Sequence, residues 1–353
     1  MSTAKKPTDK PGLLECLAAG PVLCAEGYLF ELERRGYLQA GAFVPEVIVE
    51  HPEAVLQLHR EFVNAGSDVV EALTYYAHRE KLRMVGRDGQ LEAMNRQALE
   101  LARQVADESG LLLAGNICNT NIYDPEDEAA KKSVRAVFEE QVGWAADAGV
   151  DFVIAETFAW TGEAELALDV LEAAGITAVV TFAIHKQGTT REGHSPADAC
   201  RMLEERGADV VGLNCALGPA TMLPTLKSVR AAVKGFVAAL PVPYRTTPEE
   251  PTFQALSDPR DHSYPGDRPF PTALDPFVCS RYEMAEFTRE ALALDVRYLG
   301  ICCGAGPHHV RAMAEALGRQ PPASRYSPDM SKHYSLGTDA RLKGHNQAFA
   351  KDL

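Results

Sequence analysis

The chain lacks several features that mark large classes of protein. No apolar stretch reaches the roughly 18 residues of a membrane span, and residues 1–12 have no apolar core of the kind that a secretory signal needs. Basic residues are scarce: 35 Lys and Arg against 49 Asp and Glu give a formal net charge of −14. That balance offers no footprint for nucleic acid or an anionic membrane. We therefore expect a cytoplasmic protein with small-molecule partners, without nucleic-acid or membrane partners.

Short apolar runs alternate with amphipathic segments, which is typical of βα units. The predicted strands are 21–25, 69–75, 111–118, 152–156, 178–184, 210–215, 236–242 and 298–303. The predicted helices are 52–65, 91–109, 134–148, 164–174, 196–206, 221–234, 282–294 and 307–317. Eight such pairs predict an α/β fold, the (β/α)8 TIM barrel. A doubly wound sheet is the alternative, but no Gly-x-Gly-x-x-Gly follows the first strand.

The alternation defines one predicted domain, residues 12–319, with two irregular segments. Residues 241–280 form a proline-rich insertion too long for an ordinary turn, which we expect to cover the C-terminal mouth of the barrel. Its prolines are at 241, 243, 248, 251, 259, 265, 269, 271 and 276. The tail, residues 320–353, has no core pattern, and is interpreted either as disordered or as a contact between subunits of a homo-oligomer.

Three of the eight cysteines lie at the ends of the sixth and eighth predicted strands, where the catalytic groups of a barrel collect. Cys215 ends the sixth strand, and Cys302 and Cys303 end the eighth, where Gly304 lets the chain turn. Three thiolates leave one coordination position open, as in catalytic zinc sites. We therefore predict Zn²⁺ on these cysteines, where it activates a substrate thiol for alkyl transfer. Three buried cysteines without metal are the competing interpretation.

Asn214-Cys215 and Gly300-Ile-Cys-Cys-Gly304 resemble the zinc motifs of the homocysteine S-methyltransferase family. Other segments are similar to the betaine-homocysteine methyltransferases within that family: Phe30-Glu-Leu-Glu-Arg-Arg-Gly-Tyr37, Glu50-His-Pro-Glu-Ala-Val55, Gln57-Leu-His-Arg-Glu-Phe62 and Ala102-Arg-Gln-Val-Ala-Asp-Glu108. The resemblance runs from about Gly12 to Ser324. It implies a (β/α)8 barrel, one catalytic zinc, and methyl transfer from glycine betaine to homocysteine, giving methionine and dimethylglycine.

The resemblance also implies that Glu156, at the end of the fourth strand, binds the ammonium group of homocysteine. The family usually carries Asp-Gly-Gly or Asp-Gly-Ala after the first strand, whereas this chain has Ala25, Glu26 and Gly27. We expect Glu26 or Glu71 to supply the missing carboxylate, with Gly27 beside the substrate. The family tyrosine after the strand-four glutamate is Thr157 in this chain.

Aromatic residues are predicted to form the methyl-donor pocket, because ring faces bind a cation that has no hydrogen-bond donor. Tyr75 and Tyr76 follow the second strand, Phe43 replaces a tryptophan of the betaine enzymes, and Phe270 lies in the insertion. Plain packing is the competing role for Phe43 and Phe270. Glycine betaine is the first candidate donor. Dimethylsulfoniopropionate, proline betaine and S-methylmethionine are alternatives, since each carries a methyl group on a positive atom.

A function of another class, a metal-dependent barrel hydrolase or aldolase, requires histidine and carboxylate ligands near strand ends. His185 and His194 flank a loop and show no partner spacing. Asn116, Asn119 and Asn121 follow the third strand, and either line the pocket or turn the chain.

Overall fold

Eight parallel strands form a closed barrel in the computed structural model, which describes residues 10–258 and 268–350. The strands are β1 (Val22–Ala25), β2 (Val69–Glu71), β3 (Leu112–Cys118), β4 (Phe152–Phe158), β5 (Ala178–Phe182), β6 (Val210–Asn214), β7 (Phe236–Leu240) and β8 (Tyr298–Ile301). β8 pairs with β1 and closes the barrel. The predicted (β/α)8 fold is confirmed, and the doubly wound sheet is wrong because such a sheet keeps two free edges.

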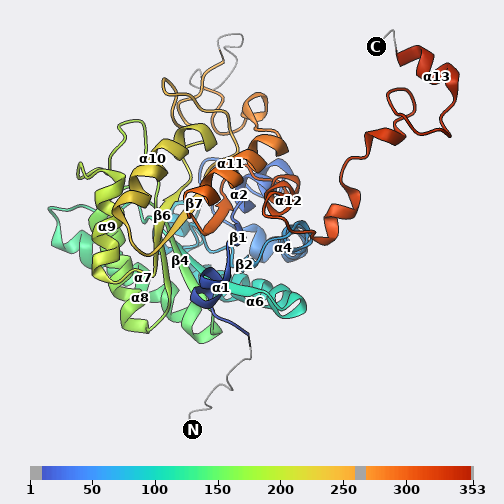
Figure 1. Cartoon of the computed structure of the whole chain (residues 1–353). Coiled ribbons are helices and arrows are strands. Elements are labelled where there is room, and N and C mark those ends of the chain that lie inside the picture. Colours follow the sequence, from blue (N-terminus) through green and yellow to red (C-terminus); the bar gives the residue numbers. More distant parts are fainter. Residues whose placement is uncertain (1–9, 259–267, 351–353) are drawn as a thin grey trace.

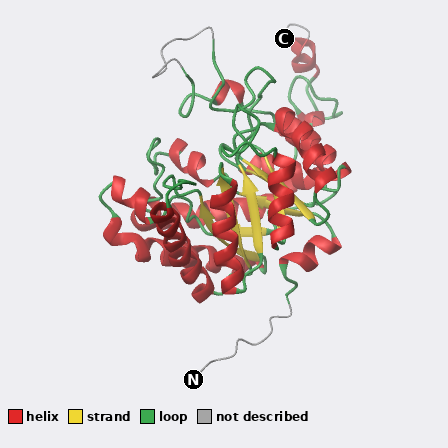
Figure 2. Cartoon of the chain, turned by 90° about the vertical axis from the view of Figure 1, so that its left-hand side faces the viewer, coloured by secondary structure: helices red, strands yellow, loops and turns green. Residues whose placement is uncertain are grey.

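A ring of helices surrounds the barrel, and Figure 2 shows the strands enclosed by them. The ring consists of α4 (Pro52–Ala65), α6 (Leu91–Ser109), α7 (Glu128–Ala148), α8 (Thr161–Ala174), α9 (Pro196–Arg206), α10 (Pro219–Ala232), α11 (Arg281–Ala293) and α12 (Pro307–Ala316). Helix α7 begins earlier than predicted, behind Asp127, whose carboxylate accepts the backbone N–H of Ala129 at 2.8 Å. No helix of the described residues has the length and apolarity needed to cross a membrane.

Several short helices were not predicted from the sequence. They are α1 (Leu13–Ala19), α2 (Tyr28–Arg34), α3 (Val47–Glu50), α5 (Arg79–Met84) and α13 (Gly344–Phe349), with 3-10 turns at Asp88–Gln90, Asp275–Phe277, Pro322–Tyr326 and Met330–Lys332. Leu13 and Leu17 of α1 pack into the apolar cluster that fills the N-terminal end of the barrel interior. Helix α1 therefore covers the N-terminal end of the barrel (Figure 1), and the C-terminal end is left for the site.

The interior of the barrel changes from apolar to polar along the strands. Alternate residues of a strand point the same way. The inward side chains near the N-terminal ends of the strands are apolar, among them Leu112, Phe152 and Tyr298. The inward positions nearest the C-terminal ends are polar and buried: Glu26, Glu71, Asn116, Glu156, Thr181 and Asn214. This polar layer lies where the active sites of barrel enzymes are found.

The described parts of the connection from β7 to α11, residues 241–258 and 268–280, lie at the C-terminal mouth of the barrel (Figure 1). Phe253 and Phe270 from this connection line the larger cavity of the site. Pro259 and Pro265 lie outside the described residues. The described parts of the insertion thus supply one wall of the pocket.

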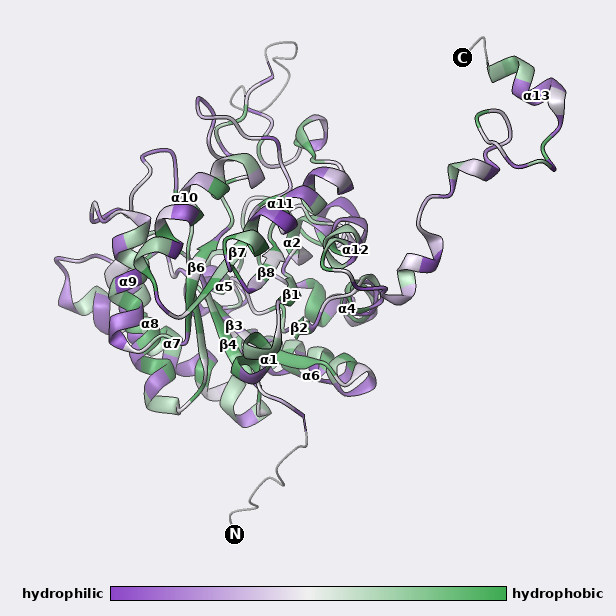
Figure 3. Cartoon of the chain, viewed as in Figure 1, coloured by the Kyte–Doolittle hydropathy of each residue, from purple (hydrophilic) through white to green (hydrophobic). Residues whose placement is uncertain are grey.

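The tail that follows α12 leaves the barrel and ends far from it at α13 (Figure 1). From residue 329 onward, the hydrogen bonds of the described residues stay within the tail. Figure 3 shows apolar stretches among its polar ones. Its exposed large apolar side chains are Tyr326, Met330, Tyr334, Leu336 and Phe349. The tail thus presents apolar surface that its own barrel does not cover.

Candidate active site

The three predicted zinc ligands come together at the mouth of the barrel. The Sγ atom of Cys303 lies 3.9 Å from that of Cys215 and 3.9 Å from that of Cys302. All three sulfurs lie within 4.8 Å of one another. The chain turns at Gly304, where φ is +93° and an added Cβ would meet the Tyr244 hydroxyl at 2.2 Å. Only glycine fits this turn, which lets two adjacent cysteines face one point.

These separations fit a tetrahedral zinc site, since Zn–S bonds of about 2.3 Å place two ligand sulfurs about 3.8 Å apart. Hydrogen bonds from the thiols of Cys302 and Cys303 lower the pKa of Cys215 to about 5. A thiolate at Cys215 in turn raises the pKa of both neighbouring thiols. The chain alone therefore supports one thiolate in this cluster, and a bound cation is needed for three.

Three glutamates meet beside Cys302 around a small cavity of about 20 Å³. Glu26, Glu71 and Glu156 are 7%, 3% and 4% exposed. Burial and the charge of Cys302 raise the pKa of Glu156 to about 8. Burial and the charge of Glu156 raise the pKa of both other glutamates well above the usual range. No Lys, Arg or His of the described residues lines this cavity, so its chemistry suits a cationic ligand group.

Two asparagines of the polar layer hold two of these carboxylates. The Asn116 amide donates to Oε1 of Glu71 at 2.5 Å and to Oε1 of Glu156 at 2.7 Å. The Asn214 amide donates to Oε2 of Glu156. Within the described residues, both oxygens of Glu26 and Oε2 of Glu71 accept no hydrogen bond. These buried oxygens are available to a ligand that donates hydrogen bonds.

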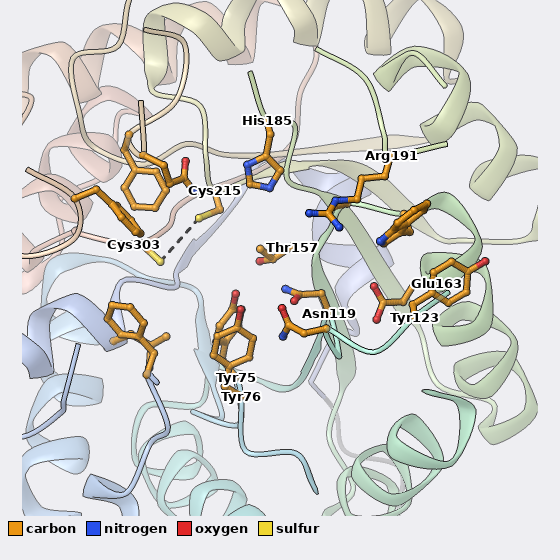
Figure 4. A pocket seen from close by; sticks show the side chains of 18 of the residues that line it. Tyr75, Tyr76, Asn119, Tyr123, Thr157, Glu163, His185, Arg191, Cys215 and Cys303 are labelled. Carbon is orange, nitrogen blue, oxygen red and sulfur yellow. Dashed lines mark hydrogen bonds between the residues drawn. The ribbon is translucent and has the colours of Figure 1, made fainter. Parts of the chain in front are cut away.

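A second cavity, of about 340 Å³, is lined by Cys215 and Cys303 (Figure 4), whereas the acidic cavity is lined by Cys302 and Cys303. Cys303, Leu29 and Tyr75 line both cavities. The sulfur cluster therefore lies between an acidic cavity and a larger cavity whose walls are rich in aromatic rings.

All the predicted donor-pocket aromatics line the larger cavity: Phe43, Tyr75, Tyr76 and Phe270. The ring centroids of Tyr75 and Tyr76 are 4.3 Å apart, and Phe43 stacks on Phe30 at 5.3 Å. The Nζ atom of Lys81 lies 3.9 Å from the centroid of the Tyr76 ring. Lys81 thus covers one face of Tyr76 and Phe30 covers one face of Phe43, so each of these two rings has one face left for a ligand.

Left-handed backbone conformations gather around this cavity. Five of the described non-glycine residues with positive φ line it: Phe43, Tyr76, Asn121, Thr157 and Cys215. Each such conformation costs on the order of 1–3 kcal/mol and persists only where the surrounding fold imposes it. The side chains that face the cavity are therefore fixed by the fold and not by local preference.

The structure places Gly27 differently from the expectation. Gly27 lines neither cavity, and an added Cβ would lie 2.6 Å from the Cβ of Ala305. Its lack of a side chain allows the turn after β1 to pack against the turn after β8. Asn119 and Asn121 line the larger cavity, whereas Asn116 belongs to the acidic one.

Several wall residues were not predicted from the sequence: Phe253, Trp160, Glu163 and Arg191 line the larger cavity. Trp160 and Glu163 lie one short turn beyond β4, so inspection of the residues that follow each strand end would have found them. Phe253 and Arg191 lie in long connections, where no periodic signal marks which side chain turns inward.

The alternative hydrolase or aldolase ligand set does not form. Among the described residues, the groups able to hold a metal contain only cysteine and glutamate. Nδ1 of His194 is hydrogen-bonded to Oγ1 of Thr161 at 2.9 Å. His185 lines the larger cavity, and burial lowers its pKa. The two histidines are not members of any ligand group.

Comparison with known proteins agrees with the fold described above. The family model described as homocysteine S-methyltransferase matches residues 27–317. Betaine–homocysteine S-methyltransferase 1 of Danio rerio is 39% identical over 334 residues, which cover 93% of this chain and 80% of that protein. The S-methylmethionine–homocysteine S-methyltransferase of Rattus norvegicus is 37% identical over 335 residues, 92% of this chain and 87% of that protein.

The fold is also that of the metallated homocysteine methyltransferase MmuM from Escherichia coli, with a TM-score of 0.66 and 20% identity over 85% of this chain and 98% of that one. The family match spans nearly the whole barrel, from the first βα turn to the last helix. The chain therefore belongs to the homocysteine S-methyltransferase family and is an enzyme that transfers a methyl group to the thiol of homocysteine.

Proposed function

We propose that the enzyme binds Zn²⁺ on Cys215, Cys302 and Cys303 and uses an onium compound as methyl donor. The observation that carries this proposal is the position of the three sulfurs between an acidic cavity and an aromatic one. Glycine betaine, dimethylsulfoniopropionate, proline betaine and S-methylmethionine all fit the aromatic wall on charge alone. Among the described residues, no group of histidines and carboxylates could hold a metal for hydrolase or aldolase chemistry.

Zinc held by three thiolates would bind the homocysteine sulfur as its fourth ligand and favour the thiolate form of that sulfur. The protein positions both substrates around that sulfur. The substrate thiol loses its proton, its sulfur forms a bond to the donor methyl carbon, and the bond from that carbon to nitrogen or sulfur breaks. The electron pair of the broken bond stays on the departing atom, which becomes neutral.

The acidic cavity takes the homocysteine ammonium in this proposal. Glu156 is oriented by Asn116 and Asn214, while Glu26 keeps both carboxylate oxygens free for the ligand. The sequence offers Glu26 and Glu71 as alternative replacements for the missing aspartate of the family. The geometry supports both, with Glu26 as the main replacement because neither of its oxygens is used by the protein.

We also propose that residues 12–319 act as one catalytic domain and that the tail contacts a second copy of the chain. We place the enzyme in the cytoplasm because all eight cysteines are free, and thiolate ligands persist in a reducing compartment. Cell fractionation that found the enzyme in an oxidising compartment would contradict this location.

Replacing Cys215, Cys302 or Cys303 with alanine should remove zinc and methyl transfer together, because each supplies one ligand. Metal analysis should find about one zinc per wild-type chain. Cys200→Ala is the matched control: its sulfur is buried 3.7 Å from the carbonyl oxygen of Gly212, outside the cluster, and this variant should keep its zinc. Full turnover by verified zinc-free enzyme would refute the proposal.

Phe43→Leu should raise the donor KM by roughly five- to thirtyfold, because one ring face worth about 1–2 kcal/mol is lost. Homocysteine KM and zinc content should stay unchanged, since Phe43 lines only the larger cavity. Steady-state kinetics with S-methylmethionine and with glycine betaine give the measurement. Phe43→Tyr, which keeps the ring, should behave like wild type; equal kinetics in all three proteins would exclude a donor contact at Phe43.

Glu26→Gln should stabilise the enzyme without substrate while weakening homocysteine use. Burial raises the folded pKa of Glu26 above its ordinary value of 4.5, so wild type loses stability as pH rises from about 4.5 through the folded pKa. The variant escapes this loss, and its gain in unfolding free energy should grow from near zero at pH 4.5 to about 1–3 kcal/mol at pH 8.

Urea unfolding at the two pH values measures this gain, and homocysteine KM should rise about tenfold or more. Glu53→Gln is the control, because the Glu53 side chain is 72% exposed; it should change neither quantity. A Glu26→Gln gain that is the same at both pH values would show that the carboxylate is not the destabilising group.

Ending the chain after residue 319 should convert a dimer or larger assembly into a monomer, because the tail exposes Tyr326, Tyr334 and Phe349 without cover from its own barrel. Sedimentation velocity of the full and shortened chains measures the change. A full chain that sediments as a monomer would contradict the subunit contact.

A further inference from the structure

The larger cavity has a polar end that the zinc chemistry does not use. Figure 4 shows Cys215 and Cys303 on one side of this cavity and Arg191 and Glu163 on the opposite side, with Thr157 between them. A donor whose methyl group lies at the sulfur cluster would extend its other end toward Arg191 and Glu163. The chemistry of this end therefore bears on which donor is used.

Arg191 reaches the cavity from the connection between β5 and α9. Its backbone N–H donates to the carbonyl oxygen of Ala159 at 2.8 Å, and its guanidinium carbon lies 5.6 Å from the centroid of the Trp160 ring. Within the described residues, the guanidinium makes no hydrogen bond and no ion pair. The neighbouring Glu192 is occupied by the backbone N–H groups of Thr161 and Gly162. Arg191 thus offers unused donors to a ligand.

Glu163 lies in the first turn of α8 and is 1% exposed. Its Oε1 atom accepts both the N–H, at 2.7 Å, and the hydroxyl of Thr120. Its Oε2 atom accepts no hydrogen bond from any described residue. Glu163 and Arg191 line the same cavity and form no ion pair within 4.0 Å, so two opposite charges stand apart at one end of the pocket.

An α-amino acid presents the complementary pair of charges. A carboxylate matches the planar guanidinium in a two-point contact, and an ammonium donates to a carboxylate. We propose that this end of the cavity is an amino-acid subsite, in which Arg191 binds the α-carboxylate and Glu163 the α-ammonium of the methyl donor. The donor is then a sulfonium amino acid of the S-methylmethionine type, an inference that rests on the proposed function.

The reaction balances with this donor. The homocysteine sulfur forms a bond to the methyl carbon, one C–S bond of the sulfonium breaks, and its electron pair stays on the departing sulfur. The thiol proton is released, and two molecules of methionine result. Glycine betaine and dimethylsulfoniopropionate have no α-ammonium, so neither of them can donate a hydrogen bond to Glu163 at this end of the cavity.

The test measures kcat/KM of the zinc-loaded full chain with homocysteine and each of three donors: S-methylmethionine, dimethylsulfoniopropionate and glycine betaine. S-methylmethionine should be preferred by about tenfold or more. Glu163→Gln keeps the shape and the Thr120 contacts; it should lower kcat/KM for S-methylmethionine about ten- to a hundredfold and leave dimethylsulfoniopropionate within about twofold. Arg191→Gln, at an exposed position, should weaken both sulfonium donors.

Equal loss for all donors in Glu163→Gln, or a wild-type preference for glycine betaine, would overturn the amino-acid subsite. Calorimetric binding of S-methylmethionine to wild type, Arg191→Gln and Glu163→Gln gives a readout that needs no turnover. If no donor yields methionine, the proposed function fails, while loss of binding in both variants still supports the subsite. Unchanged binding in Arg191→Gln alone would refute it, even where Glu163→Gln did not fold.

Discussion

Burial of three carboxyl groups and three thiols side by side is the constraint on which the rest of the site depends. Burial raises the pKa of Glu26, Glu71 and Glu156, and the charge of Glu156 raises the pKa of the other two glutamates further. A thiolate at Cys215 raises the pKa of Cys302 and Cys303. No Lys, Arg or His side chain of the described residues lines the acidic cavity. The arrangement is costly when empty and favourable when a metal ion and an ammonium group are present, so the site is built for ligands more than for stability.

Closure of the barrel is what imposes this arrangement. Parallel strands bring all their C-terminal ends to one rim, and the polar layer of Asn116 and Asn214 holds Glu156 at that rim. Cys215, with a left-handed backbone, follows β6 directly, and the left-handed Thr157 lies at a register shift near the end of β4. The cost of these conformations is offset by packing in the barrel and by α1, which fills the opposite end.

In the proposed function, the two cavities divide the recognition of homocysteine and of an onium methyl donor. The acidic cavity would bind the ammonium group of homocysteine through its carboxylates. The faces of the aromatic rings near the sulfurs would contact the methylated cationic group of the donor, which cannot donate a hydrogen bond. Arg191 and Glu163, which form no ion pair with each other, would add a third element that binds the end of the donor that does not react. Specificity for the donor would then lie mainly in the connections after β4 and β5, and reactivity in the strand ends.

The sequence by itself determined the barrel fold, because the alternation of apolar runs and amphipathic segments is a local pattern. It also marked Cys215, Cys302 and Cys303 as candidate metal ligands, because they lie at the ends of predicted strands. Sequence motifs around these cysteines and in the first helices also indicated the family. Only the tertiary structure decided that Glu26 and Glu71 both join Glu156, that Gly27 packs against Ala305, and that Lys81 occupies one face of Tyr76. Arg191 and Glu163 likewise became a pair only in space. Such contacts join residues from different strands and long connections, whose meeting depends on barrel closure and left-handed turns that no periodic pattern encodes.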